Sequence, residues 1–303
     1  MICATEFVCT INESSNSAVF RCSDGHYYVV TFQGITDRSA SLGTKFLTCK
    51  LASSIGLPTP DVEVVAVEQG LIDHSDGLIS VSPWLQMFSD AKDFHGTTRK
   101  KVALQCGSRY LVEPRDGKLF DYFPETALSR VGNLNVFAGA LAFDLWMKRA
   151  GARQTVFCRS SHDTLYNAAF LYHGWEPRKC DPMGCAFDPA RVAMYRHKAV
   201  YQDISEWCDF EPFLSRVGAV NSRILEGIAG QIPAIWCDGC NWVSPFLREL
   251  RKRQEIVRPL LSRFLFANPD IFPNWSDTEL VANVRDRESV RYEIDNMSEL
   301  AVM

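Results

Sequence analysis

AVFRCSDGHYYVVTFQ, residues 18–33, holds two runs rich in valine, phenylalanine and tyrosine on either side of Asp24-Gly25. Runs of this length and composition are typical of β-strands. An Asp-Gly pair between two strands favours a tight turn, because glycine readily adopts the positive φ that such a turn requires. The stretch therefore predicts a β-hairpin.

A helix and two more strands are predicted after this hairpin. Apolar residues recur at helical spacing over residues 41–55, and Gly56 followed by Pro58 is a usual helix end. Residues 61–68, DVEVVAVE, alternate as a strand, and residues 107–111 indicate a further strand. The first hundred or so residues thus predict a small antiparallel sheet with one helix.

The character of the chain changes to helices beyond Pro124. Residues 135–149 carry a broad apolar face, suited to the centre of a helical region. Ser244 before Pro245 predicts a helix N-cap followed by proline in the first turn. Residues 268–303 are acidic and poor in apolar side chains, which predicts a loosely held tail. The other elements predicted here are strands at 155–159 and 168–172 and helices at 210–217, 222–230 and 245–266.

The composition is that of an ordinary soluble chain of 303 residues, 47% hydrophobic and 22% charged. Its 32 Lys and Arg against 36 Asp and Glu give a net charge of −4, which disfavours nucleic acid and anionic membranes as partners. The most continuous apolar stretch, residues 136–147, falls short of the ~20 residues that span a bilayer. Because the first ten residues lack a basic region and carry Glu6, we expect no secretory signal and a cytoplasmic location.

Four of the eleven cysteines allow more than one interpretation. The string WCDGC at residues 236–240 is superficially similar to a thioredoxin-type pair, but it lacks a surrounding βαβ unit, so plain loop thiols or a structural disulfide are favoured. Cys237 and Cys240 could also join Cys180 and Cys185 in a four-cysteine zinc site, although the spacing of the second pair is loose. A zinc-stabilised structural protein is therefore a further alternative.

The order of the predicted elements is that of a protein-kinase-like fold, with a hairpin, a helix, more strand and then a helical part interrupted by short strands. Six strings occur in this order along the chain, namely SDGHYYVVTFQG (23–34), LASSIGLPTPDVEVVAV (51–67), GSRYL (107–111), FAGALAFDLW (137–146), RQTVF (153–157) and IPAIW (232–236). Over about residues 5–265 the chain resembles the HipA-like family of bacterial kinases, from its small stand-alone subgroup. The resemblance implies an α+β, bilobal, protein-kinase-like fold with a small antiparallel-sheet N-lobe with one helix at 1–112, a mainly helical C-lobe at 113–267 and a tail at 268–303.

Kinase chemistry requires a strand lysine on the nucleotide phosphates and a helix glutamate that holds this lysine. In relatives that this chain resembles, the second hairpin strand reads VVKF, whereas this chain reads VVTF and has Thr31 at the lysine position. The helix glutamate of those relatives, in a string such as NEY or NEW, is matched by Lys45. Their glycine-rich turn is matched by residues 12–17, which contain no glycine. The resemblance thus implies that the lysine–glutamate ion pair is absent.

The catalytic loop and the metal site also depart from the family pattern. The pattern Asn-x-Asp-x-Arg-Gln is matched by residues 149–154, where Gly151 replaces the catalytic aspartate while the neighbours Arg153 and Gln154 are retained. The metal-binding aspartate, in a string such as FIDQG or LIDHG, is matched by Tyr172. A neutral phenol is a poor Mg²⁺ ligand, since this ion prefers carboxylate oxygens.

These replacements together predict a pseudokinase, a kinase-like protein that acts by binding or regulating a protein partner of unknown identity, with no cofactor. Removing one electrostatic contributor commonly lowers a rate by roughly 10² to 10³, and several are replaced here. The alternative is a HipA-like serine/threonine kinase or a nucleotidyl-transferring enzyme with a rebuilt ATP site. Such an enzyme would use ATP and Mg, and could use Lys45 and Arg153 as phosphate ligands, so enzymatic activity stays open.

Overall fold

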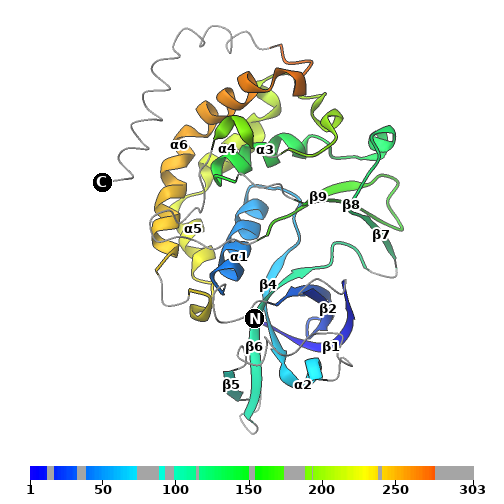
Figure 1. Cartoon of the computed structure of the whole chain (residues 1–303), viewed down its shortest axis with the longest axis vertical. Helices are drawn as coiled ribbons and strands as arrows, with labels where there is room; N and C mark the ends of the chain where they lie inside the picture. The colour runs from blue at the N-terminus through cyan, green and yellow to red at the C-terminus, as the bar shows by residue number, and fades with distance from the viewer. Residues whose placement is uncertain are drawn as a thin grey trace. The chain divides into compact units, whose positions relative to one another are not determined.

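The computed structural model describes most of the chain as an α+β protein with two β-sheets and several helices (Figure 1). No helix in this part of the chain is long and apolar enough to cross a membrane. The described residues are 1–11, 17–32, 39–73, 89–92, 99–113, 116–149, 154–173, 188–192, 194–237 and 241–276.

Two compact units make up the chain, and each is assembled from three separate stretches. The predicted lobes at 1–112 and 113–267 are continuous stretches, and their boundaries stay predictions. The first unit holds Met1–Asn133, Arg153–Cys185 and Val220–Glu249, and the second holds Leu134–Ala152, Ala186–Ala219 and Leu250–Met303.

The larger sheet closes on itself. Its strand order is β3-β2-β1-β4-β6-β5, and β3 also pairs with β6, so five strands form a ring that β5 extends at β6. A ring of five strands cannot alternate direction all the way round, which explains why the small sheet is not wholly antiparallel as predicted. The parallel pair is β1 with β4. The six strands are β1 (Ile2–Thr10), β2 (Ser17–Cys22), β3 (Tyr27–Thr31), β4 (Val62–Glu68), β5 (Ser89–Lys92) and β6 (Arg99–Arg109).

The predicted hairpin is confirmed as β2 and β3. Gly25 has φ +83° and occupies the turn, as the Asp-Gly pair predicts. The Asp24 carboxylate accepts hydrogen bonds from the main-chain N–H of His26 at 3.1 Å and from the hydroxyl of Tyr28 at 2.8 Å. These bonds hold the turn and the first residues of β3 together.

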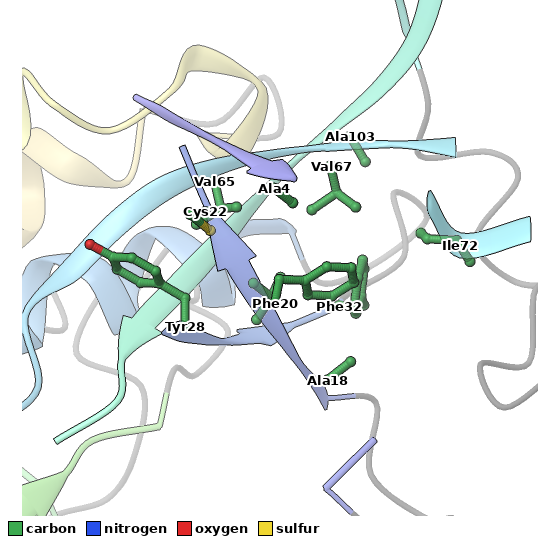
Figure 2. Packing of buried hydrophobic residues seen from close by; sticks show 11 residues of the cluster. Ala4, Ala18, Phe20, Cys22, Tyr28, Phe32, Val65, Val67, Ile72 and Ala103 are labelled. Carbon is green, nitrogen blue, oxygen red and sulfur yellow. The ribbon is translucent and has the colours of Figure 1, made fainter. Parts of the chain in front are cut away.

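Alternate side chains of the ring point into a common apolar core, which Figure 2 shows from close by. On β2 these are Ala18, Phe20 and Cys22, two residues apart as strand geometry requires. The ring of Phe20 packs edge-on against that of Phe32, with centroids 5.9 Å apart. The full cluster is Ala4, Ala18, Phe20, Cys22, Tyr28, Val30, Phe32, Val65, Val67, Ile72 and Ala103.

Helix α1 (Ser39–Ser54) connects β3 to β4, and most of its residues are buried, including the polar side chains of Thr44 and Thr48. Gly56 has φ +78° just after the helix, which confirms the predicted helix end. A β-carbon added to Gly43 would lie 2.7 Å from the ring of Trp242, so this position requires glycine. Phe46 packs edge-on against Trp236, with ring centroids 6.1 Å apart.

The smaller sheet has the order β7-β8-β9 and belongs to the first unit. Strands β8 (Gln154–Ser160) and β9 (Asn167–Leu171) confirm the two short strands predicted after the apolar helix. Strand β7 (Gly117–Phe120) was not predicted, because its four residues carry no alternating pattern.

The remaining helices confirm the helical character predicted beyond Pro124. Every residue of α3 is buried, and Arg253 of α6 donates to the carbonyls of Leu145 and Trp146 at its C-terminal end. Helix α6 begins at Val243, and Ser244 and Pro245 both lie within its first turn. The prediction of Ser244 as the N-cap was therefore wrong, because the N-cap is the residue before the helix. The α-helices are α2 (Gln69–Asp73), α3 (Val136–Trp146), α4 (Glu211–Ala219), α5 (Ser222–Ala229) and α6 (Val243–Ala267), and the 3₁₀ helices are η2 (Glu125–Arg130), η3 (Pro189–Arg191), η4 (Lys198–Tyr201), η5 (Trp207–Asp209), η6 (Ala234–Cys237) and η7 (Pro269–Ile271).

The predicted loose tail is wrong for its first part, residues 268–276. Phe272 packs edge-on against Tyr201, with centroids 5.8 Å apart, and Trp275 packs against Trp207 at 5.6 Å. The main-chain N–H of Ser276 donates to a carbonyl of the same unit. Aromatic side chains in an otherwise polar segment explain this packing, and residues 277–303 lie outside the described part.

Candidate functional site

The candidate site lies in the first unit, where the end of β3 meets the side of α1. Lys45 Nζ donates a hydrogen bond to Thr31 Oγ1 at 3.1 Å. Lys45 is only 9% exposed. The two positions that the resemblance assigns to the phosphate lysine and its helix partner are therefore in direct contact.

A second hydroxyl completes a short chain of polar contacts. Ser17 Oγ donates to Thr31 Oγ1 at 3.2 Å, and the register of the hairpin places Ser17 directly opposite Thr31. Thr31 Oγ1 therefore accepts from both a hydroxyl and an ammonium group. Because a hydroxyl carries no charge, this arrangement does not neutralise Lys45.

No carboxylate of the described residues lies within 4.0 Å of Lys45 Nζ. An acid–base pair further along the same helix joins Lys50 of α1 to Glu63 of β4 at 3.2 Å. Glu63 is thus engaged by the lysine one turn further along the helix. The site consequently holds a mostly buried cation whose hydrogen-bond acceptor is neutral.

A buried thiol also borders this site. Cys106 of β6 pairs with Thr31 in the β3–β6 register and is fully buried. Burial raises the pKa of the Cys106 thiol to about 12, and the positive charge of Lys45 opposes this shift only in part. The thiol is therefore neutral at physiological pH and does not serve as the counter-ion of Lys45.

Tyr172, at the position expected for the metal-binding aspartate, follows β9 and lies against the same helix. It is 1% exposed, and its main-chain oxygen accepts from Cys49 Sγ at 3.9 Å. Cys49 lies one helical turn beyond Lys45. Thr31, Lys45 and Tyr172 are therefore all arranged around α1, although they are far apart in the sequence.

The other predicted site residues are not brought into this arrangement. Gln154 is exposed at the start of β8, whereas Gly151 and Arg153 lie outside the described residues. Of the candidate zinc ligands, Cys237 is half-buried in η6, and burial raises its pKa. Cys180, Cys185 and Cys240 lie outside the described residues. The described part contains no group of three or more His, Cys, Asp or Glu that could hold a metal ion.

Sequence reasoning missed Ser17 and Cys106 as neighbours of Thr31. A signal for Ser17 was present, because a hairpin closed at Asp24-Gly25 fixes which residues of its two strands lie opposite each other. No local signal identifies Cys106, since its pairing joins strands separated by α1 and β4.

The solved structures to which this chain is similar include two kinases and one toxin–antitoxin complex. The proinflammatory kinase CtkA of Helicobacter pylori is 11% identical, with 86% of this chain and 95% of that chain covered and a TM-score of 0.48. The Golgi casein kinase is 10% identical, covering 88% and 72%, with a TM-score of 0.48. The HipA, HipB and operator DNA complex of the Shewanella oneidensis MR-1 toxin–antitoxin system gives 11% identity, 83% and 67% coverage and a TM-score of 0.40.

No protein-family model matches the chain, and no curated protein matches it.

Proposed function

We propose that this chain is a HipA-like pseudokinase that acts by binding or regulating a partner protein, and that it does not transfer phosphate. The observation that carries the proposal is the hydrogen bond between Lys45 and Thr31. In a kinase, the corresponding contact is an ion pair that points a strand lysine at the nucleotide phosphates. Here the cation starts from the helix, and the strand presents a neutral hydroxyl.

The residues present do not fit a bound Mg–ATP complex. Magnesium requires hard oxygen ligands, and the position expected to supply a carboxylate holds the buried Tyr172. A phenol remains protonated near neutral pH and supplies no negative charge to the ion. Phosphoryl transfer depends almost entirely on positioning and charge neutralisation, so these replacements favour a binding role over catalysis.

A thermal-shift titration with ATP and ADP, each with and without Mg²⁺, tests this proposal. A ligand at 100 times its Kd adds about 2.7 kcal/mol to the folded state and raises Tm measurably. We expect no Mg²⁺-dependent shift and no transfer of labelled phosphate to the chain or to a generic protein substrate. A Mg²⁺-dependent shift accompanied by phosphate transfer contradicts the proposal.

A charge-swapped variant provides the matched comparison. Thr31→Lys combined with Lys45→Glu places a lysine on the strand and a carboxylate on the helix, at positions that are already in contact. If loss of this pair weakens nucleotide binding, the swapped variant should bind ATP more tightly than the unmodified chain. If the two chains bind ATP equally, the loss of nucleotide binding has its cause at another replaced position.

A second candidate function is supported by the charge of Lys45. A mostly buried ammonium that meets no carboxylate among the described residues can hold an anion, as the alternative of a rebuilt ATP site requires. On this hypothesis ATP raises Tm without Mg²⁺, and Lys45→Met abolishes that shift. An ATP effect that survives Lys45→Met would exclude Lys45 as the phosphate ligand.

A further inference from the structure

The two edges of the smaller sheet differ in how their main-chain groups are used. The outer edge of β9 is covered: the N–H of Tyr166 donates to the carbonyl of Arg130, and the N–H of Gly132 donates to the carbonyl of Tyr166, both at 2.8 Å. The side chain of Asn133 donates to the carbonyl of Ala168 at 3.0 Å and accepts from its N–H at 2.7 Å. These contacts occupy the positions that an added strand would use.

The opposite edge, β7, has no strand on its outer side among the described residues. Its side chains are exposed, including Leu119 at 39% and Phe120 at 42%, and Tyr122 just beyond the strand is 45% exposed. An open edge offers unpaired N–H and C=O groups to a strand from another chain. Apolar side chains beside such an edge add contact area for the incoming strand.

Aromatic rings and two arginines form one face of this sheet. The Tyr166 ring lies 5.7 Å from that of Phe120 and 4.9 Å from that of Phe123. The guanidinium groups of Arg159 and Arg130 lie 4.8 and 5.7 Å from the centroid of the same Tyr166 ring. Two positive charges therefore converge on one ring beside an exposed phenylalanine.

Neither arginine has a carboxylate within 4.0 Å in the described part of the chain. Arg159 Nε is also shielded from solvent and has no hydrogen-bond partner there. The strand register places Lys118 opposite Arg159, so a third cation lies on the same face. The nearby Asp163 carboxylate accepts from the main-chain N–H of Ser160 within its own turn. An added anion would lower the repulsion among the three cations and satisfy the buried Nε donor.

We propose that this surface, defined as the β7 edge with Phe120, Arg130 and Arg159, binds an extended acidic segment of a partner protein. The segment pairs with β7 through its main chain and places carboxylates on the two guanidinium groups. This inference rests on the proposed function, because a protein that acts through a partner requires a docking surface. A protein occupant fits better than nucleic acid, because pairing with the open β7 edge requires main-chain N–H and C=O groups, which a nucleic acid lacks.

Fluorescence anisotropy with the full chain tests this surface. The probes are fluorescein-labelled octapeptides of alternating valine and glutamate, or valine and lysine, and labelled oligothymidylate. We expect the glutamate peptide to bind and the other two to bind at least tenfold more weakly. Arg130→Gln combined with Arg159→Gln should weaken the glutamate peptide about tenfold, as expected for two ion pairs.

The matched control is Arg223→Gln combined with Arg248→Gln, which makes the same change of charge at exposed sites on α5 and α6. It should leave binding of the glutamate peptide unchanged. A glutamate peptide with N-methyl groups on alternate residues should lose binding, because it cannot pair with β7. Any one of three results would overturn the proposal. The N-methyl peptide binds as tightly as the unmodified glutamate peptide, both double variants lose the same affinity for the glutamate peptide, or oligothymidylate binds more tightly than the glutamate peptide.

The two proposals can fail separately. If the chain binds neither the acidic peptide nor a nucleotide, the docking proposal is wrong and the pseudokinase proposal stands. Magnesium-dependent phosphate transfer together with acidic-peptide binding overturns the pseudokinase proposal and keeps the surface.

Discussion

Thr31 provides the hydrogen-bond acceptor for the mostly buried Lys45, so its replacement should lower the stability of the fold. We expect Thr31→Val to lower the free energy of unfolding by about 1 to 3 kcal/mol, because it leaves the Lys45 ammonium without its acceptor. Urea denaturation followed by fluorescence measures this change.

Two further variants separate this cause from a loss of packing. Thr31→Ser keeps the hydroxyl and should retain most of the stability. Adding Lys45→Met to Thr31→Val removes the charge and should recover most of the loss, as seen when both partners of a polar pair become apolar. A double variant less stable than Thr31→Val contradicts this account.

Asp24 makes the hairpin sensitive to acid. Partial burial raises the pKa of Asp24, but hydrogen bonds from the His26 N–H and the Tyr28 hydroxyl outweigh that effect and lower it below the usual 3.8. The resulting stabilisation is complete above about pH 5 and is lost as the pH falls through the lower folded-state pKa.

The variant Asp24→Asn keeps the turn preference but cannot ionise. It should be less stable than the unmodified chain at pH 7, and the difference should shrink towards pH 3. Urea denaturation between about pH 3 and pH 7 measures this difference in the free energy of unfolding. The control is Asp116→Asn, which makes the same change at an exposed site. A difference that does not change with pH would show that ionisation of Asp24 is not involved.

The contact between α3 and α6 depends on reciprocal hydrogen bonds. Arg253 donates to the last carbonyls of α3, and Trp146 Nε1 donates to the Leu250 carbonyl of α6 at 2.9 Å. Arg253→Met should lower the free energy of unfolding by about 2 to 4 kcal/mol, because it removes the charged donor to the buried Trp146 carbonyl and one of the donors to the Leu145 carbonyl. Thermal and urea denaturation measure the loss, and Arg248→Met, at an exposed site of α6, should have little effect.

Elements with strong periodicity were predictable from the sequence, and weakly patterned strands were not. The turn at Asp24-Gly25 and the helix end at Gly56 were found because glycine conformations leave a local signature. β1 mixes exposed and half-buried residues with no regular alternation, and β7 has only four residues, so neither stood out. The start of α6 was misplaced because helix ends are read less securely than helix interiors.

The positions of Thr31, Lys45 and Tyr172 were identified from the resemblance, but their common arrangement around α1 was not. Their contacts depend on pairing between segments far apart in the chain, such as β3 with β6. Sequence periodicity describes which side of an element is apolar, and it does not say which distant element covers that side. The closed ring of five strands was unpredictable for the same reason.

The charge balance of the complete chain makes its solubility depend on pH. The sequence pI is about 5.9, and repulsion between molecules falls as the net charge approaches zero. Solubility, measured as the protein remaining after sedimentation, should be lowest near pH 5.9 and should rise on both sides. A minimum more than one pH unit away would indicate that ionisable groups are strongly perturbed.

The closed ring sets an order of events during synthesis on the ribosome. Strands β2 and β3 emerge together and can pair at once. Strand β3 can pair with its second neighbour, β6, only after the chain has been extended by the 78 residues from Thr31 to Arg109. At about 5 to 20 residues per second this interval lasts roughly 4 to 16 s. During that time the apolar side of the hairpin, including Phe20 and Val30, has no complete enclosure. The nascent chain is therefore a substrate for chaperones until the last strand of the ring has left the exit tunnel.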